Sequence, residues 1–181
     1  MNEPAGEAVD PTDSVGESPL VIRNATADDL GTILAIYNDA ILNGIALWLD
    51  DPVELANREG WLRSQTEGGF PVYVAEVDGT VVGYASYGLW RPYTGFRHTV
   101  TNTIYLVAGH QGRGIGSALL ERVVVHARDA GFHVMIADIE SGNLASVALH
   151  TKFGFETAGV VREVGTKFGS WLDLTIMRLA L

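Results

Sequence analysis

The chain has 181 residues, of which 47% are hydrophobic and 19% charged, and its formal net charge is −10 at pH 7. This length fits one domain, and we expect a globular protein with no membrane partner because no apolar run approaches the roughly 18 residues of a spanning helix. The negative charge argues against a nucleic-acid partner, since phosphate backbones are bound by basic surfaces. The absence of cysteine excludes disulfides and thiolate chemistry.

Residues 1–18 differ in composition from the rest of the chain. They hold five acidic residues, two prolines and two glycines, but no lysine or arginine. We expect a disordered acidic tail, because too few apolar side chains are present to offset the entropy of ordering. Residues 19–181 should form a single domain. The tail lacks the basic start and apolar middle of a secretion signal, so a cytoplasmic protein is expected.

A strand and a helix are predicted directly after the tail. Residues 20–25 favour a short strand. Thr26, followed three residues later by Asp29, has the spacing of a capping box, in which two side chains satisfy free backbone groups at the start of a helix. Apolar residues then recur at helical spacing until Gly44, where this helix should end.

A second helix and a hairpin are predicted next. Pro52 suits the first turn of a helix that should run to about Gln65. Two β-rich runs then flank Asp78 and Gly79, a pair typical of tight turns between adjacent antiparallel strands. After a loop over 91–98, a third β-prone run leads into a stretch rich in glycine.

The centre of the chain has the pattern of a βαβ unit. A strand over 99–107, a glycine loop and a helix ended by Gly131 precede a strand over 133–140. The strands of such a unit are parallel. A short helix over 143–153 and strands over 156–163 and 170–179 follow. We expect the α+β class, with a mixed, mostly antiparallel sheet, a central parallel βαβ unit and helices on both faces. The helix of the unit should bury Ile115, Ala118, Leu119, Val123, Ala127 and Ala130.

Gly112, Gly114 and Gly116 lie where this helix begins. The first N–H groups of a helix have no intrahelical partner and carry the positive end of its dipole, so they attract anions. Glycine lets the backbone approach a phosphate without interference from Cβ, and Arg113 can add a charged contact. The alternative is a flexible turn that binds no ligand.

Two other phosphate-binding loops fit these glycines poorly. An ATP or GTP loop is excluded because no Gly-Lys-Ser/Thr follows. Asp138 lies at roughly the right distance for the acidic residue of a dinucleotide fingerprint. However, the spacing is G-x-G-x-G with Ser117 in place of the third glycine, and too few residues remain for the second half of that fold.

The segment Gln111–Gly116 reads Q-G-R-G-I-G and matches the Q/R-x-x-G-x-G/A signature of the GNAT acetyltransferase superfamily. The predicted order of elements over 20–181 is similar to the GNAT fold. Residues 139–177, IESGNLASVALHTKFGFETAGVVREVGTKFGSWLDLTIM, resemble the phosphinothricin and methionine sulfoximine/sulfone N-acetyltransferases. The resemblance implies an enzyme that moves an acetyl group from acetyl-CoA to the α-amine of a small amino acid or analogue by direct attack in a ternary complex.

The resemblance also implies a cofactor site. In these families the glycine loop cradles the pyrophosphate of acetyl-CoA, and the backbone of the preceding strand binds the pantetheine arm. Asn143 and His150 occupy the N-x6-H/Y positions, where the first binds pantetheine and the second protonates the departing sulfur. A lone histidine is otherwise more often a packing residue. The implied cofactor residues are Ile104, Tyr105, Leu106, Gln111, Gly112, Arg113, Gly114, Ile115, Gly116, Ser117, Asn143 and His150.

An acceptor site is expected around the loop over 91–98. Guanidinium groups suit the carboxylate of an amino acid, and aromatic rings suit its apolar stem. Solvated arginines are the alternative. With the positions implied by the resemblance, the expected acceptor residues are Tyr37, Arg91, Arg97, Thr101, Asn102 and Lys167.

Thr101 departs from the resembled families, which have T-V-E where this chain has T-V-T. That glutamate is implicated in handling the acceptor ammonium, whereas a threonine hydroxyl cannot serve as a base near neutral pH. Three interpretations remain open: Asp138 or Glu140 supplies the base, the enzyme accepts amines that are already neutral, or the domain binds acyl-CoA without catalysis. Thr101 and His150 are the predicted catalytic residues.

Metal chemistry and several other functions are not favoured. The five histidines show no spacing typical of a zinc site, so no metal is expected. The resemblance implies a homodimer. A noncatalytic acyl-CoA-binding regulator and a protein N-terminal acetyltransferase remain the alternatives to an amino-acid acetyltransferase.

Overall fold

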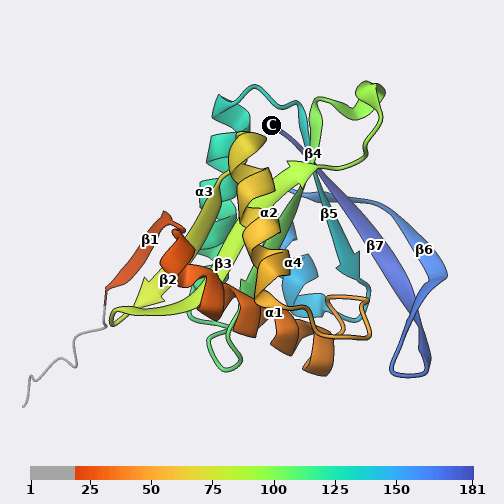
Figure 1. Ribbon diagram of the computed structural model, residues 1–181. Coiled ribbons are helices and arrows are strands. Elements are labelled where there is room, and N and C mark those ends of the chain that lie inside the picture. The colour runs from red at the N-terminus through yellow and green to blue at the C-terminus, as the bar shows by residue number, and fades with distance from the viewer. Residues whose placement is uncertain (1–18) are drawn as a thin grey trace, which may run out of the picture.

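The computed structural model describes residues 19–181, so the disorder expected of residues 1–18 lies outside the described residues. Figure 1 shows a twisted sheet with helices on both sides. In chain order the elements are β1 (Leu20–Asn24), the 3-10 turn η1 (Ala27–Asp29), α1 (Leu30–Asn43), α2 (Leu55–Glu67), β2 (Val72–Val77), β3 (Thr80–Leu89), the 3-10 turn η2 (Thr94–Phe96), β4 (Thr99–Leu106), α3 (Ile115–Asp129), β5 (Val134–Glu140), α4 (Leu144–Lys152), β6 (Glu156–Lys167) and β7 (Ser170–Ala180).

The strands form one seven-stranded sheet in the order β1-β2-β3-β4-β5-β7-β6. β4 and β5 pair in parallel, and the other neighbouring strands pair antiparallel. Helix α3 connects the two parallel strands, as a βαβ unit requires. The predicted α+β class and mixed, mostly antiparallel sheet are therefore confirmed.

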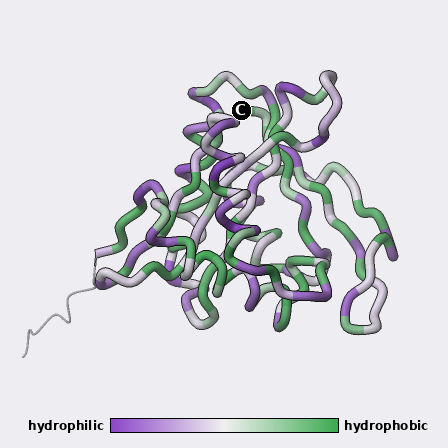
Figure 2. The backbone as a smooth tube through the Cα atoms, viewed as in Figure 1, coloured by the Kyte–Doolittle hydropathy of each residue, from purple (hydrophilic) through white to green (hydrophobic). Residues whose placement is uncertain are grey.

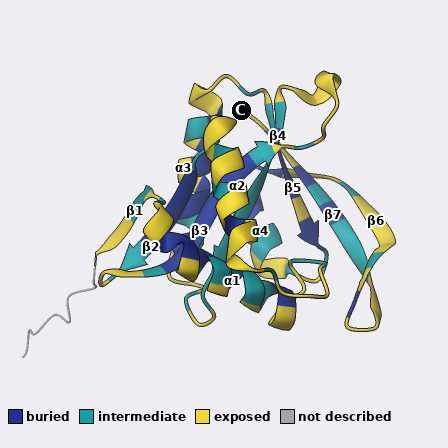
Figure 3. Ribbon diagram, in the orientation of Figure 1, coloured by how far each residue is buried: buried dark blue, intermediate teal, exposed yellow. Residues whose placement is uncertain are grey.

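Two hydrophobic clusters cover opposite faces of the sheet. One joins the sheet to α3 and to part of α4, and the other joins it to α1 and α2. We refer to these as the α3 face and the α1 face. Side chains alternate along a strand, so β4 serves both faces: Val100 and Ile104 pack in the first cluster and Tyr105 packs in the second. Figure 3 shows that burial is greatest in the central strands.

Two element boundaries differ from the prediction. Pro52 lies outside α2, which begins at Leu55. The side-chain amide of Asn38 bonds both to the N–H and to the carbonyl of Val53, at 2.9 Å each, and these bonds hold the segment before the helix to α1. β6 continues to Lys167 instead of ending near 163, because it pairs with β7 through shifts in register that skip residues of β6.

The buried stripe of α3 is wider than predicted. Ala130 is exposed because it lies just beyond the last turn of the helix, and Ala118 is only partly buried. Leu120 and Val124 are buried although the predicted stripe omitted them. The sheet beneath α3 covers more of the helix surface than a single narrow stripe.

The predicted capping box is present, and it belongs to a charged cluster. Thr26 N donates to Asp29 Oδ2 at 2.8 Å, and both carboxylate oxygens of Asp29 accept from Arg23 at 2.8 Å. Arg23 also donates to Glu76 on β2 at 2.9 Å. Hydrogen bonding to the Arg23 guanidinium lowers the pKa of Asp29 to about 2.

Replacing Asp29 with asparagine should therefore destabilise the protein in a pH-dependent way. Because the folded-state pKa lies below the ordinary value, the ionised carboxylate stabilises the fold above about pH 4, and this contribution disappears as the pH falls towards 2. We expect Asp29→Asn to lower the free energy of unfolding by about 2 kcal/mol at pH 7, with a smaller difference at pH 3. Urea unfolding at both pH values measures this. Asp28→Asn is the matched control, since it removes the same charge from an exposed neighbour. An equal loss in both variants would contradict the prediction.

Candidate active site

β4 and β5 separate partway along their length and leave a cavity between them. They pair with each other only through Thr99, Val100 and Thr101 of β4, and beyond Thr101 each strand continues paired with its other neighbour alone. The cavity has a volume of about 970 Å³ and is lined by the diverging halves of both strands, the end of α1, the glycine loop and α4. One space therefore connects the helix start at the glycines with the face covered by α1.

The glycine loop has the backbone of an anion cradle. Gly109, Gly112 and Gly114 have φ values of 83°, 76° and 79°, in the left-handed region that other residues rarely adopt. Gly114 is the N-cap of α3, so the free N–H groups of the first turn lie beside the cavity that it lines. Gln111 holds the loop by accepting from Gly109 N at 2.9 Å.

His150 lies at the other side of the cavity, on α4, and is 3% exposed. Its Nδ1 is 2.8 Å from the carbonyl of Ser146, and its Nε2 is 3.1 Å from Oδ1 of Asn102 on β4. Asn102 in turn donates through Nδ2 to the carbonyl of Ile136 on β5, at 3.3 Å. A side chain of β4 thus bridges the separated strands and contacts the imidazole.

These contacts determine where His150 carries protons. The carbonyl of Ser146 can only accept, so Nδ1 donates to it. Because Nδ2 of Asn102 faces a carbonyl, its Oδ1 faces Nε2 and accepts from it. Only the imidazolium donates to both groups at once, because one nitrogen of the neutral ring carries no proton. Burial lowers the pKa of His150, and the bond to Ser146 opposes this lowering in part. Burial therefore favours the neutral ring, and the imidazolium gives up its proton readily when it forms.

The loop between β3 and β4 supplies aromatic and cationic groups. Arg91 and Arg97 are exposed, and Arg97 donates to the carbonyl of Thr94 at 3.1 Å. The ring of Trp90 packs edge-on against Phe96 with centroids 5.4 Å apart, and the guanidinium of Arg91 lies 4.8 Å from the Trp90 ring. This cluster can bind a carboxylate beside an apolar stem.

Comparisons with known proteins agree with this geometry. The family model of the acetyltransferase (GNAT) family matches residues 33–155. An L-methionine sulfoximine/L-methionine sulfone acetyltransferase of Pseudomonas aeruginosa is 51% identical over 161 residues, covering 88% of this chain and 94% of the relative. The chain belongs to the GNAT acetyltransferase family. Its sheet with separated parallel strands is accordingly the GNAT fold, as the resemblance implied.

Two solved structures are similar to this chain over most of their length. A phosphinothricin acetyltransferase from Sinorhizobium meliloti, in complex with acetyl-CoA, is 37% identical with a TM-score of 0.87 and covers 90% of this chain and 88% of its own. A ribosomal-protein-alanine N-acetyltransferase from Brucella melitensis is 50% identical with a TM-score of 0.87 and covers 89% of this chain and 99% of its own.

Most predicted cofactor residues of this GNAT domain lie together around the cavity. Arg113 is exposed beside it, whereas Ile115 points into the core with 2% exposure. Asn143 caps α4 by accepting from Ser146 N at 3.1 Å. The predicted residues that line the cavity are Asn102, Ile104, Tyr105, Leu106, Gln111, Gly112, Gly114, Gly116, Ser117, Asn143 and His150.

Several predicted acceptor residues lie outside the cavity lining. Lys167 is buried, and its ammonium donates to the carbonyls of Ala40 and Leu47, so it tethers the end of α1 and the following loop to the β6–β7 hairpin. Burial lowers the pKa of Lys167. Tyr37 stacks under the guanidinium of Arg58, 3.8 Å from its ring centroid, and no sequence motif had indicated that contact.

No group of three or more histidine, aspartate or glutamate side chains suited to a metal ion occurs within residues 19–181. In the same part of the chain, no helix is both long and apolar enough to cross a membrane.

Proposed function

We propose that this GNAT domain, expected over residues 19–181, transfers an acetyl group from acetyl-CoA to the α-amine of a small amino acid. Methionine sulfone, methionine sulfoximine and phosphinothricin are the leading acceptors, since relatives carry these names. The observation that carries the proposal is the single cavity between β4 and β5, which joins the glycine cradle to the α1 face. A donor held at one end and an amine entering from the other meet in the position that direct attack requires.

The residues that would hold acetyl-CoA fit an elongated molecule with an anionic end. The N–H groups at the start of α3 bind the pyrophosphate, with Arg113 beside them. The backbone of Ile104, Tyr105 and Leu106 binds the pantetheine arm, because that half of β4 has lost its β5 partner. A main-chain N–H in this stretch polarises the thioester carbonyl.

His150 acts as the proton donor to the sulfur that leaves. When the ring is charged, both nitrogens donate to these contacts, and burial makes the imidazolium lose its proton easily. The ring lines the same cavity as the half of β4 that no longer pairs with β5. Protonation of the departing sulfur lowers the barrier to breaking the carbon–sulfur bond.

The acceptor carboxylate pairs with Arg91 and Arg97, and its stem packs against the aromatic residues of the same loop. One relative supports a second candidate acceptor, the N-terminal alanine of a ribosomal protein. A peptide acceptor lacks a free carboxylate on its first residue, so the two exposed arginines favour the free amino acid.

Thiol release from acetyl-CoA tests the proposed function directly. Methionine sulfone, methionine sulfoximine, phosphinothricin and a peptide with an N-terminal alanine are compared between pH 7 and 9. The chain has no cysteine, so the protein adds no thiol signal. Turnover of the free amino acids with little turnover of the peptide supports the proposal. Tight acetyl-CoA binding without turnover of any acceptor would contradict it in favour of a noncatalytic acyl-CoA-binding regulator.

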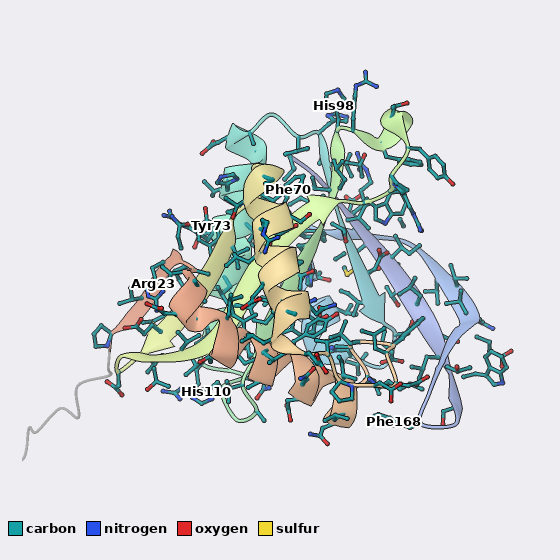
Figure 4. All side chains as sticks on the ribbon, viewed as in Figure 1. Arg23, Phe70, Tyr73, His98, His110 and Phe168 are labelled. Atoms are coloured by element: carbon teal, nitrogen blue, oxygen red, sulfur yellow. The ribbon has the colours of Figure 1, made fainter. Side chains whose placement is uncertain are left out.

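We further propose that the protein is a cytoplasmic homodimer formed through the β6–β7 hairpin. This hairpin projects beyond the helices, with Phe168 at its end (Figures 1 and 4), and Figure 2 shows hydrophobic stretches along it. Trp171 and Phe168 are 68% and 63% exposed, and three valines of β6 are exposed as well. Such a surface is typical of a protein interface.

Replacing Trp171 with glutamate should weaken the dimer by at least roughly 10-fold in Kd, because a central interface tryptophan commonly contributes more than 1 kcal/mol. Sedimentation equilibrium measures the dissociation constant. Val125→Glu is the control, since Val125 is an exposed apolar residue of α3, away from the hairpin. A wild-type protein that sediments as a 19.5 kDa monomer would refute the dimer.

A further inference from the structure

Asp138 points to the same side of the sheet as Thr101, on the face where the acceptor enters. Thr101 pairs in register with Ile136, and paired residues of neighbouring strands share a face. Met135 and Ala137, on either side of Ile136, pack in the cluster of the α3 face. Ile136 and Asp138 therefore face the α1 side. His150 lies across the sheet from them, since Asn102 reaches it from the opposite face of β4.

Three carboxylates line the cavity, and their contacts differ. Glu140 is buried and accepts from Gly142 N at 2.9 Å. Asp39 belongs to α1 and accepts from Asn43 at 2.8 Å. Asp138 is exposed to the cavity, where one oxygen accepts from Trp90 Nε1 at 3.1 Å. Within residues 19–181 its other oxygen has no hydrogen-bond partner, and the same holds for one oxygen each of Asp39 and Glu140. Asp138 differs from them in its contact with Trp90, which lies next to the loop between β3 and β4.

We propose that Asp138 binds the ammonium group of the acceptor amino acid and takes a proton from it before the attack. This inference rests on the proposed function, which needs a neutral amine, and Thr101 cannot act as the base. A carboxylate with one free oxygen on the acceptor side meets that need. Asp138 is therefore the catalytic carboxylate. Thr101 lies near it on the adjacent strand and takes no part in the proton transfer.

Trp90 positions this carboxylate and connects it to the loop that binds the acceptor's other charge. Its indole donates to Asp138 at 3.1 Å, and the same indole lies 4.8 Å from the guanidinium of Arg91. A cation and an anion held against one side chain match the carboxylate and ammonium of an α-amino acid, which are separated by a single carbon. The arrangement discriminates against amines that lack a carboxylate.

The protons balance between the two faces of the sheet. Asp138 takes one proton from the ammonium, and the nitrogen then forms its bond to the acetyl carbon as the carbon–sulfur bond breaks. His150 supplies the proton that the sulfur requires, and the second proton lost by the nitrogen passes to solvent. Asp138 and His150 return to their starting states by exchange with water, so no further reactant is needed.

Replacing Asp138 with asparagine should lower kcat/KM for methionine sulfone roughly 30-fold at pH 7, the loss of one charge-assisted hydrogen bond and of the base. The loss in kcat/KM should become smaller as the pH approaches 9.5, because the amine then loses its proton unaided. The Kd of the variant for acetyl-CoA should stay within about twofold of the wild-type value. Adding Thr101→Glu to the Asp138→Asn variant should raise kcat/KM again by at least about 10-fold, since it returns a carboxylate to the same face of the sheet. Trp90→Phe should give a smaller loss and the same change in pH profile.

Direct binding separates this inference from the proposed function. Calorimetry with CoA present should show weaker binding of methionine sulfone to Asp138→Asn, whereas 4-(methylsulfonyl)butanoic acid, which lacks the amine, should bind both proteins equally. Asp129→Asn, on the surface at the end of α3, is the matched charge control. If the wild type fails to turn over, the proposed function fails while binding still decides the role of Asp138. Unchanged kcat/KM and binding in Asp138→Asn, or an equal effect of Asp39→Asn, would overturn the inference.

Discussion

Replacing His150 with glutamine is expected to lower kcat by at least roughly 100-fold at pH 7, the range in which a positioned general acid contributes. The KM for acetyl-CoA should change by less than about threefold, because glutamine still reaches Asn102 but cannot supply a labile proton. The high-pH limb of the wild-type kcat profile should disappear, since it reflects loss of the imidazolium proton. Burial lowers the pKa of His150, so this limb should begin at lower pH than an exposed histidine would give.

Steady-state kinetics between pH 6 and 9.5, with thiol release as the signal, measures these effects. His133→Gln serves as the control because His133 is exposed and lies outside the cavity lining. His150 packs against Phe155 with centroids 4.9 Å apart, so unfolding is measured in parallel to detect a packing defect. A loss confined to the KM for acetyl-CoA would assign His150 to binding and refute its role as the acid.

Replacing Gly114 with valine is expected to lower kcat/KM for acetyl-CoA roughly 100-fold, chiefly through KM. Gly114 has a φ of 79°, and a β-branched residue avoids this conformation at a cost of about 1–2 kcal/mol. The chain relieves the strain by moving the loop, and the N–H groups at the start of α3 then no longer point together at a phosphate. Charge-assisted hydrogen bonds contribute about 1.5–3 kcal/mol each, so misplacing one or two accounts for the effect.

Gly131 offers a closely matched control at the other end of the same helix. Its φ is also 79°, and at neither glycine does an added Cβ meet an atom within 4 Å. Gly131→Val should therefore lower the free energy of unfolding about as much as Gly114→Val does, while the KM for acetyl-CoA stays within about twofold of the wild-type value. Binding of CoA, measured by calorimetry, gives the same comparison without turnover. An equal rise of KM in both variants would show that general destabilisation, and not the cradle, is responsible.

Features that depend on neighbouring residues agree with the prediction. Asp78 and Gly79 have φ values of 51° and 72°, as a tight hairpin turn requires, and the strands on either side are antiparallel. The capping box of Thr26 and Asp29 forms, and Gly131 ends α3 with a positive φ. Each follows from steric or hydrogen-bonding preferences that act over a few residues.

Features that depend on distant contacts were missed. Pro52 does not start a helix, because Asn38 of α1 binds the backbone at Val53. The sequence also did not indicate that the ammonium of Lys167, which stays a predicted acceptor residue, donates to carbonyls at the end of α1 and in the next loop. Neither contact leaves a pattern in the sequence, because each joins segments whose proximity depends on the order of the strands.

The chemical components of the site were recognisable along the chain: the glycines before α3, the Asn143 and His150 spacing, and the arginines among aromatic residues. Their arrangement was decided by the fold. Asn102 meets His150, and Trp90 meets Asp138, and in each pair the partners are 48 residues apart. Local preferences encode turns, caps and helix starts. The separation of β4 and β5, and the alternation that directs Asp138 to one face and Asn102 to the other, exist only once the strands have paired.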